Sequence, residues 1–124
     1  LTFRNLHNWM TGGYDKDALE AIYKTLRPGG IFGLVDHRAK PSKDFDTTLN
    51  TGYVPEDYIL ALAKEVGFEF LGSSDFNNNP KDTKDHPRGV WTLPPTFRLK
   101  DVDRAKYDAI GESDRMTLKF RRPE

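Results

Sequence analysis

Two short polar segments follow strand-like runs in this 124-residue sequence, and both contain side chains suited to proton transfer. Residues 4–9 follow the short run 1–3, and residues 36–38 follow the apolar run 31–35. In an open α/β sheet, ligands bind outside the carboxyl ends of the strands. The sequence therefore predicts that both polar segments face a ligand-binding crevice.

Within these segments, His7 and His37 are the candidates for a general base, because an imidazole titrates near neutral pH. Asp36 could orient either ring by accepting its N–H. Asn5 offers an amide donor and acceptor, and Trp9 offers a face on which a ligand could stack. These residue types fit acid–base chemistry on a small-molecule substrate.

Each of these residues also has a simpler interpretation. A loop histidine is often solvated or bonded to the backbone, Asp36 could cap a turn, and Trp9 could belong to the core. His7, Asp36 and His37 have acceptable chemistry for a metal, but their sequence separation gives no support for such a site, and we predict none. The third histidine, His86, lies beside a proline in a polar stretch and is expected to be exposed.

Several other functional classes have no signature in the sequence. There is no cysteine, which excludes disulfides and thiolate chemistry, and neither glycine-rich phosphate motif occurs. Nineteen basic and nineteen acidic residues give zero formal net charge, which argues against a broad nucleic-acid surface. No apolar run approaches the length of a membrane span. We therefore expect neither a nucleic-acid nor a membrane partner.

Hydrophobic periodicity predicts the elements that would position the polar segments. Apolar positions at helical spacing predict helices over residues 15–26 and 55–66, which end at Pro28 and Gly67 respectively. The polar, aperiodic residues 39–52 are expected to be a loop. Short apolar or alternating runs predict strands at 1–3, 31–35, 68–71 and 116–120.

Residues 77–114 are the least regular stretch, rich in charge and proline, with only a short helix expected over 102–109. A loop this long inside a compact domain is usually functional or mobile. Its aromatic residues Trp91, Phe97 and Tyr107 indicate that it packs against something.

Strands and helices alternate along the chain, which predicts an α/β fold with right-handed crossovers. The last strand follows no clear crossover helix, so we expect it to run antiparallel. The length suits one modest core, and residues 1–124 are expected to form a single domain.

The phrase Leu26-Arg27-Pro28-Gly29-Gly30, which leads from a helix into a buried strand, resembles the entry to the fifth strand of class I S-adenosylmethionine-dependent methyltransferases. Val66-Gly67-Phe68 resembles that family's turn into its sixth strand, and residues 116–120 resemble its antiparallel seventh strand. The resemblance covers essentially the whole chain. It extends to a group of predicted bacterial methyltransferases whose substrates are poorly defined.

This resemblance implies the carboxyl-terminal half of a Rossmann-like methyltransferase sheet, with strands equivalent to the fourth to the seventh and flanking helices. The family holds S-adenosylmethionine mainly through a glycine-rich turn and an acidic residue, and both would lie upstream of Leu1. The chain alone is therefore expected to be inactive. The resemblance also implies catalytic or acceptor-flanking roles for His7, Asp36 and His37, and cofactor contacts from Arg4, Asn5, Leu6 and Trp9.

In that family the fourth strand pairs with the first, so here it would be an open edge. We expect this edge, formed by Leu1 to Phe3, to join a second copy into a homodimer with one continuous sheet. Two other hypotheses stay open. One is a non-catalytic, stand-alone α/β binding or assembly module. The other is a hydrolase or metal enzyme, which requires His7, Asp36 and His37 to converge within hydrogen-bond reach.

Overall fold

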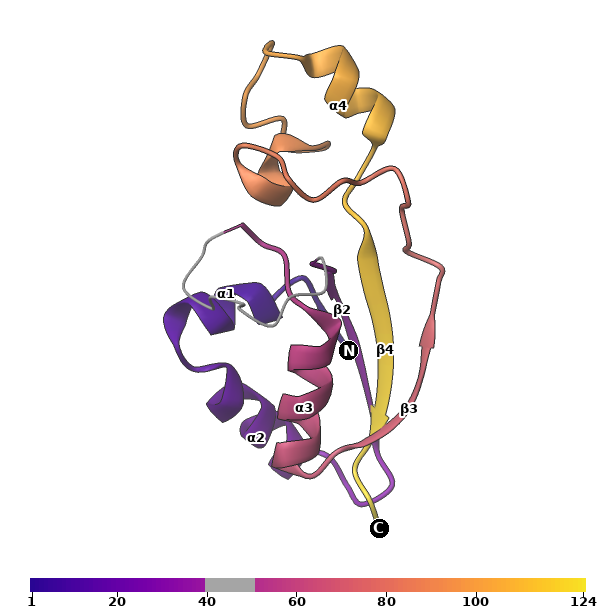
Figure 1. Ribbon diagram of the computed structural model, residues 1–124. Coiled ribbons are helices and arrows are strands. Elements are labelled where there is room, and N and C mark those ends of the chain that lie inside the picture. The colour runs from indigo at the N-terminus through magenta and orange to yellow at the C-terminus, as the bar shows by residue number, and fades with distance from the viewer. Residues whose placement is uncertain (40–50) are drawn as a thin grey trace.

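A four-stranded sheet with the order β1-β2-β4-β3 forms the centre of the structure (Figure 1). The computed structural model describes residues 1–39 and 51–124. Strand β1 (Thr2–Phe3) runs parallel to β2 (Ile31–His37), and β4 (Arg115–Arg121) runs antiparallel between β2 and β3 (Glu69–Ser74). The predicted α/β class and the reversed last strand are both confirmed. The inner position of that last strand was not predicted.

Strand β4 alternates between buried apolar residues and more exposed polar ones, so it contributes one face to the core. Met116, Leu118 and Phe120 are at most 1% exposed, whereas Lys119 between them is exposed. Leu118 pairs with Leu34 of β2, which is also fully buried, so the apolar face continues across the sheet. Each such side chain contributes about 2 kcal/mol by its removal from water.

Three helices cover this apolar face: α1 (Leu6–Gly12), α2 (Asp15–Thr25) and α3 (Glu56–Val66) (Figure 1). Helices α2 and α3 match the predicted helices over 15–26 and 55–66. Helix α1 was not predicted, because seven residues are too few to show a helical period clearly. The loop expected over 39–52 lies largely outside the described residues. The fully buried side chains that the three helices contribute to the core are Leu6, Leu19 and Ile59.

Residues 75–114 form a segment, here called the cap, that extends beyond the end of the sheet at which β2 ends and β4 begins (Figure 1). The cap contains a short 3-10 helix, η1 (Gly89–Thr92), and helix α4 (Arg104–Ile110). Helix α4 matches the predicted short helix, while η1 was not predicted. The cap has its own buried side chains, which include Val90, Leu93 and Tyr107.

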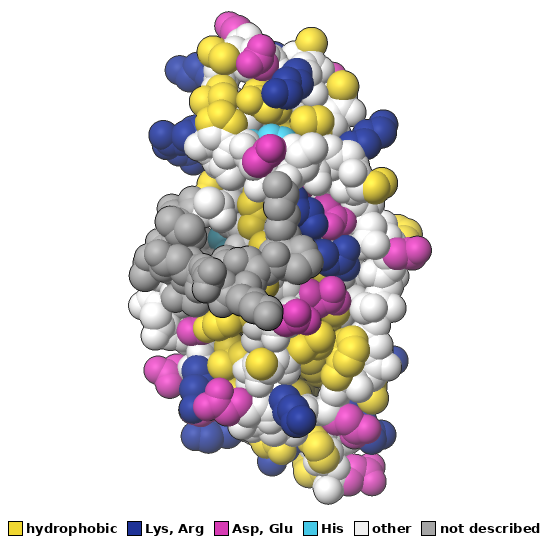
Figure 2. Space-filling view, in the orientation of Figure 1, with side chains coloured by type: hydrophobic (Ala, Val, Ile, Leu, Met, Phe, Trp, Pro, Cys, Tyr) yellow, Lys and Arg dark blue, Asp and Glu magenta, His cyan; other side chains and the backbone are white. Residues whose placement is uncertain are grey.

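The other face of the sheet has no helix over it among the described residues (Figure 1). Ile31 of β2 is 48% exposed there and lines a shallow apolar depression. Figure 2 shows acidic and basic side chains interspersed over the face drawn, rather than gathered by sign. No helix in the described part of the chain combines the length and the apolar character needed to cross a membrane.

Candidate functional site

The Asp36 carboxylate, fully buried at the end of β2, is held by three N–H groups from two elements. Its Oδ1 accepts the backbone N–H of His37 at 2.7 Å and lies 2.9 Å from Nδ1 of His7. Its Oδ2 accepts the backbone N–H of His7 at 3.0 Å. That N–H belongs to the first turn of α1 and has no partner within the helix. Asp36 therefore ties the start of α1 to the end of β2.

His7 is oriented for proton transfer by this carboxylate. Because a buried carboxylate accepts hydrogen bonds, Nδ1 of His7 carries the proton and its Nε2 keeps a free lone pair. The carboxylate also stabilises the imidazolium that forms when Nε2 takes up a proton. The pair therefore has the geometry of an oriented general base.

His37 has a different environment, although its ring lies only 5.3 Å from that of His7. Its Nδ1 forms a hydrogen bond with the hydroxyl of Ser113 from the cap. Burial lowers the pKa of His37 to about 4, and the neighbouring cations Arg115 and Arg4 act in the same direction. His37 is therefore neutral at physiological pH and is a weaker base than the free imidazole.

The cap covers the two histidines with Trp91, which lies in η1. The indole ring meets the edge of the His7 ring at a centroid distance of 6.0 Å. Next to Trp91, the backbone of the cap lies close to the backbone of residue 51, since Val90 N–H donates to the carbonyl of Thr51 at 2.9 Å. A Cβ on Gly89 would lie 2.2 Å from that carbonyl oxygen, so glycine is required there. The sequence predicted that Trp91 packs against something but gave no sign that this involves His7.

The residues expected to contact a cofactor differ in how much of their surface is available to a ligand. Asn5 donates its amide N–H to the Thr2 hydroxyl at 3.1 Å, next to the end of β1. The Leu6 side chain is fully buried in the core, which leaves only its backbone available to a ligand. Trp9 is partly buried and packs against the same core. Arg4 is exposed and projects beside His37.

The arrangement also bears on the hydrolase or metal hypothesis. Potential ligand atoms of His7, Asp36 and His37 lie within 4.8 Å of one another, so the required convergence exists. Both Asp36 oxygens and Nδ1 of each histidine already form hydrogen bonds, however. Binding an ion through these atoms would break those bonds. Nε2 of His7 forms no such bond among the described residues, so that atom could take up a substrate proton or bind an ion without breaking the others.

A second buried carboxylate, Asp82, anchors the cap. The Tyr53 hydroxyl donates to it, at 2.9 Å from each oxygen, and burial together with the Asp82 charge raises the pKa of Tyr53 above its usual value. The backbone N–H groups of Lys84 and Asp114 also donate to Asp82, and Nε2 of His86 lies 2.9 Å away. The expectation that His86 is exposed is therefore wrong, since its side chain is only 3% exposed.

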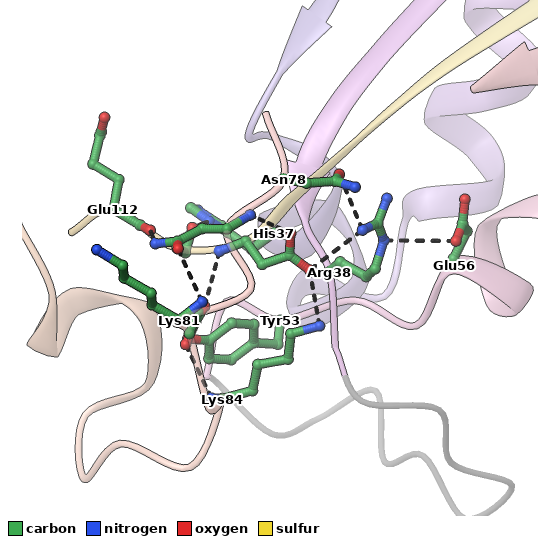
Figure 3. Close-up of polar contacts among 12 residues, drawn as sticks. His37, Arg38, Tyr53, Glu56, Asn78, Lys81, Lys84 and Glu112 are labelled. Atoms are coloured by element: carbon green, nitrogen blue, oxygen red, sulfur yellow. Dashed lines mark hydrogen bonds and ion pairs between the residues drawn. The ribbon is translucent and has the colours of Figure 1, made fainter. Parts of the chain in front are cut away.

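Ion pairs continue this network toward the sheet (Figure 3). Asp114 lies 2.9 Å from Nζ of Lys84 and 3.3 Å from the guanidinium of Arg38, which follows β2. Burial alone would raise the pKa of Asp114, but these cations and the Asn79 N–H hold it below its usual value. Figure 3 shows the Arg38 guanidinium between Asn78 and Glu56, so Arg38 joins the cap to α3. The sequence gave no signal for this network, because its members come from separate aperiodic segments.

Comparison with known proteins identifies a structural likeness but no family. No family model matches the sequence, and no curated protein matches it. Among solved structures, the chain is similar to the crystal structure of the [4+2]-cyclase SpnF, with a TM-score of 0.53 and 18% sequence identity. The match covers 89% of this chain and 44% of that chain, so this chain spans less than half the length of its neighbour. The likeness shows a Rossmann-like α/β fold.

Proposed function

We propose that this chain is the carboxyl-terminal half of an S-adenosylmethionine-dependent methyltransferase, in which His7 removes a proton from the methyl acceptor. The observation that carries the proposal is the buried His7–Asp36 pair, with Nδ1 of His7 2.9 Å from Oδ1 of Asp36. The pair lies beyond the carboxyl ends of two neighbouring parallel strands, where ligands of open α/β sheets bind.

The sheet supports the half-domain part of the proposal. Its order β1-β2-β4-β3, with β4 reversed, fits the resemblance to the fourth, fifth, seventh and sixth strands of the methyltransferase family. Parallel α/β sheets are normally covered on both faces, and the described helices cover only one here. Leu1 is 85% exposed, and Phe3 of β1 is 49% exposed. An upstream half would cover these apolar side chains.

The residues present fit one wall of a cofactor site. Asn5 offers polar atoms and the partly buried Trp9 offers an aromatic surface, next to the open edge of β1. The sequence contains no glycine-rich phosphate motif of either kind. Most contacts to S-adenosylmethionine would therefore come from the upstream half, and Asn5, Trp9 and the backbone at Leu6 would complete them.

When bound, S-adenosylmethionine supplies an electrophilic methyl group on its sulfonium. The acceptor's hydroxyl or amine proton passes to Nε2 of His7, and Asp36 stabilises the resulting imidazolium through Nδ1–H. The neutral His37 adds a polar wall, and Trp91 excludes water from the side of the cap. Alignment of acceptor and methyl group provides the rest of the rate enhancement.

The test compares this chain with the longer protein that includes the upstream half. Calorimetry with S-adenosylmethionine should give micromolar binding for the longer protein and no detectable heat for this chain at millimolar ligand. His7→Gln in the longer protein should lower kcat by about 100-fold or more and leave cofactor affinity unchanged. Asn8→Ala, an exposed neighbour on α1, serves as the control.

Two results would overturn the proposal. If the longer protein does not bind S-adenosylmethionine, the non-catalytic α/β binding or assembly module becomes the better description. If it binds the cofactor and transfers methyl groups equally well with Gln at position 7, then His7 is not the base.

A further inference from the structure

A small pocket of about 70 Å³ lies where three strands meet the cap, and its lining includes His37 and Trp91, whose rings both contact that of His7. Arg4 follows β1, His37 ends β2 and Arg115 begins β4, so the three side chains come from neighbouring strands at one end of the sheet. The cap closes the pocket with Trp91 and Ser113. This volume suits a single carboxylate or phosphate group rather than a whole substrate.

The two arginines have unused hydrogen-bonding capacity. Nε of Arg115 is buried and has no hydrogen-bond partner among the described residues. Within the ranges 1–39 and 51–124, the Arg115 guanidinium pairs only with Glu112, at 3.4 Å, and that carboxylate is 52% exposed. Arg4 forms no ion pair with any residue in the ranges 1–39 and 51–124. An ion pair with an exposed carboxylate such as that of Glu112 contributes less than about 1 kcal/mol of stability, so an incoming anion can compete with it for Arg115.

Arg4 is also held in a backbone conformation that non-glycine residues rarely adopt. Its φ is 55°, and its N–H donates to the carbonyl of Val35. Such strain costs about 1–3 kcal/mol and concentrates at functional sites. Here it accompanies the placement of the Arg4 side chain in the lining of the pocket.

A second pocket, which shares Trp91 with the first, is also lined by positively charged side chains. Its volume is about 300 Å³, and Arg88 and Arg98 line it together with the indole. No acidic side chain lines this second pocket, and Glu112 is the only one that lines the first, within the described part of the chain. Four arginines therefore line the two pockets that share Trp91.

We infer that the pocket between Arg4 and Arg115 binds a carboxylate or phosphate group of the methyl acceptor. That the oxyanion belongs to a methyl acceptor rests on the proposed function, whereas the binding of an oxyanion in this pocket does not. Guanidinium groups bind carboxylate and phosphate oxygens through paired, charge-assisted hydrogen bonds. The Ser113 hydroxyl and the neutral His37 ring are further polar groups in the same pocket. This inference places Arg4 on the acceptor rather than on the cofactor.

The test titrates this chain with inorganic phosphate and, separately, with sodium acetate at constant ionic strength, without S-adenosylmethionine. NMR would follow the Nε–H of Arg115 and the indole N–H of Trp91. We expect saturable shifts at both groups, with one anion binding more tightly and so identifying the oxyanion. Arg4→Gln and Arg115→Gln should each weaken binding by about tenfold, which is the loss of one charge-assisted hydrogen bond.

Arg27→Gln is the matched control, since Arg27 is exposed and precedes β2 at the opposite end of that strand. Because Arg4 is exposed and unpaired among the described residues, Arg4→Gln should fold even if Arg115→Gln does not. The inference fails if neither anion gives a saturable shift, or if Arg27→Gln weakens binding as much as Arg4→Gln. If the longer protein does not bind S-adenosylmethionine but this chain still binds an anion, the methyltransferase proposal is overturned and the oxyanion site is not.

Discussion

Burial and hydrogen bonding make the two histidines of the site unequal, although their rings lie 5.3 Å apart. His7 is paired with a carboxylate that is already bound by two backbone N–H groups. His37 donates its backbone N–H to the same carboxylate, but its ring forms a hydrogen bond with Ser113 instead. One imidazole is therefore held by a carboxylate, while burial keeps the other neutral. Neighbouring titratable groups with opposed environments commonly divide roles in this way.

The depressed pKa of His37 predicts a loss of stability in acid. The unfolded chain binds this proton below about pH 6.5, but the folded chain does not until about pH 4. Stability contributed by the neutral ring is therefore present above that window and falls as the pH drops through it. Between pH 7 and pH 5 we expect His37 to cost on the order of 2 kcal/mol of unfolding free energy.

Urea unfolding of the wild type and of His37→Gln at both pH values measures this effect. The variant should lose less stability than the wild type between pH 7 and pH 5, because glutamine does not titrate. Equal losses in the two proteins would show that His37 is not the group responsible.

At the scale of elements, the cap is attached to the sheet by polar contacts more than by an apolar interface. Asp82 receives donors from Tyr53, Lys84 and Asp114, and Arg38 joins Asp114 to α3 through Glu56. The hydrophobic core cluster of the domain contains no residue of the cap. The position of the cap over His7 therefore depends on a few buried hydrogen bonds.

Removing the Asp82 carboxylate should loosen the cap. Asp82→Ala removes the acceptor of the buried Tyr53 hydroxyl, the buried Asp114 N–H and the partly buried Lys84 N–H, and we expect a loss of about 3 kcal/mol. Hydrogen exchange should rise in residues 75–114 more than in α2 and α3. Asp108→Ala, at an exposed position on α4, is the control and should change little. A uniform rise across the chain would contradict a locally held cap.

The sequence predicted the helices that are long enough to show a clear hydrophobic period. Helices α2 and α3 have eleven residues each and show apolar positions at helical spacing. Helix α1 has seven residues, and its polar His7 interrupts the pattern between the buried Leu6 and Met10, so it was missed. The rule that ligands bind at the carboxyl ends of strands directed attention to His7 and Asp36, which the structure brings into contact.

The remainder of the site depends on long-range contacts that no local pattern encodes. Ser113 meets His37 across 76 residues, and Trp91 meets His7 through a cap whose path is aperiodic. His86 lies four residues after Asp82, but nothing in the sequence indicates that both are buried. Their burial follows from the folding of the cap onto Tyr53.

On the scale of the whole molecule, the two edges of the sheet differ. Edge strand β3 has a register shift between Phe70 and Gly72, and such bulges discourage pairing with another chain. Edge strand β1 has no such irregularity, and Leu1 and Phe3 expose apolar surface beside it. The β1 edge is therefore the more open to another strand.

We predict that the 124-residue chain forms a dimer through β1. Because β1 has only two residues, the dimer should gain few hydrogen bonds and should dissociate on dilution. Light scattering across a concentration series measures the mass. Phe3→Lys should give a monomer at all concentrations, while Leu71→Lys on the β3 edge should leave the dimer intact. A wild-type monomer throughout the series would contradict the prediction.

The inner position of β4 has a consequence for synthesis on the ribosome. β4 is the last strand along the chain, yet it supplies every sheet hydrogen bond of β3 and one entire side of β2. Until residues 115–121 emerge from the exit tunnel, β3 has no neighbour and Phe32 and Leu34 lack their facing partners. A nascent chain that has passed β3 but not yet β4 therefore carries an incomplete apolar core, and this is the interval in which chaperones would have most to protect.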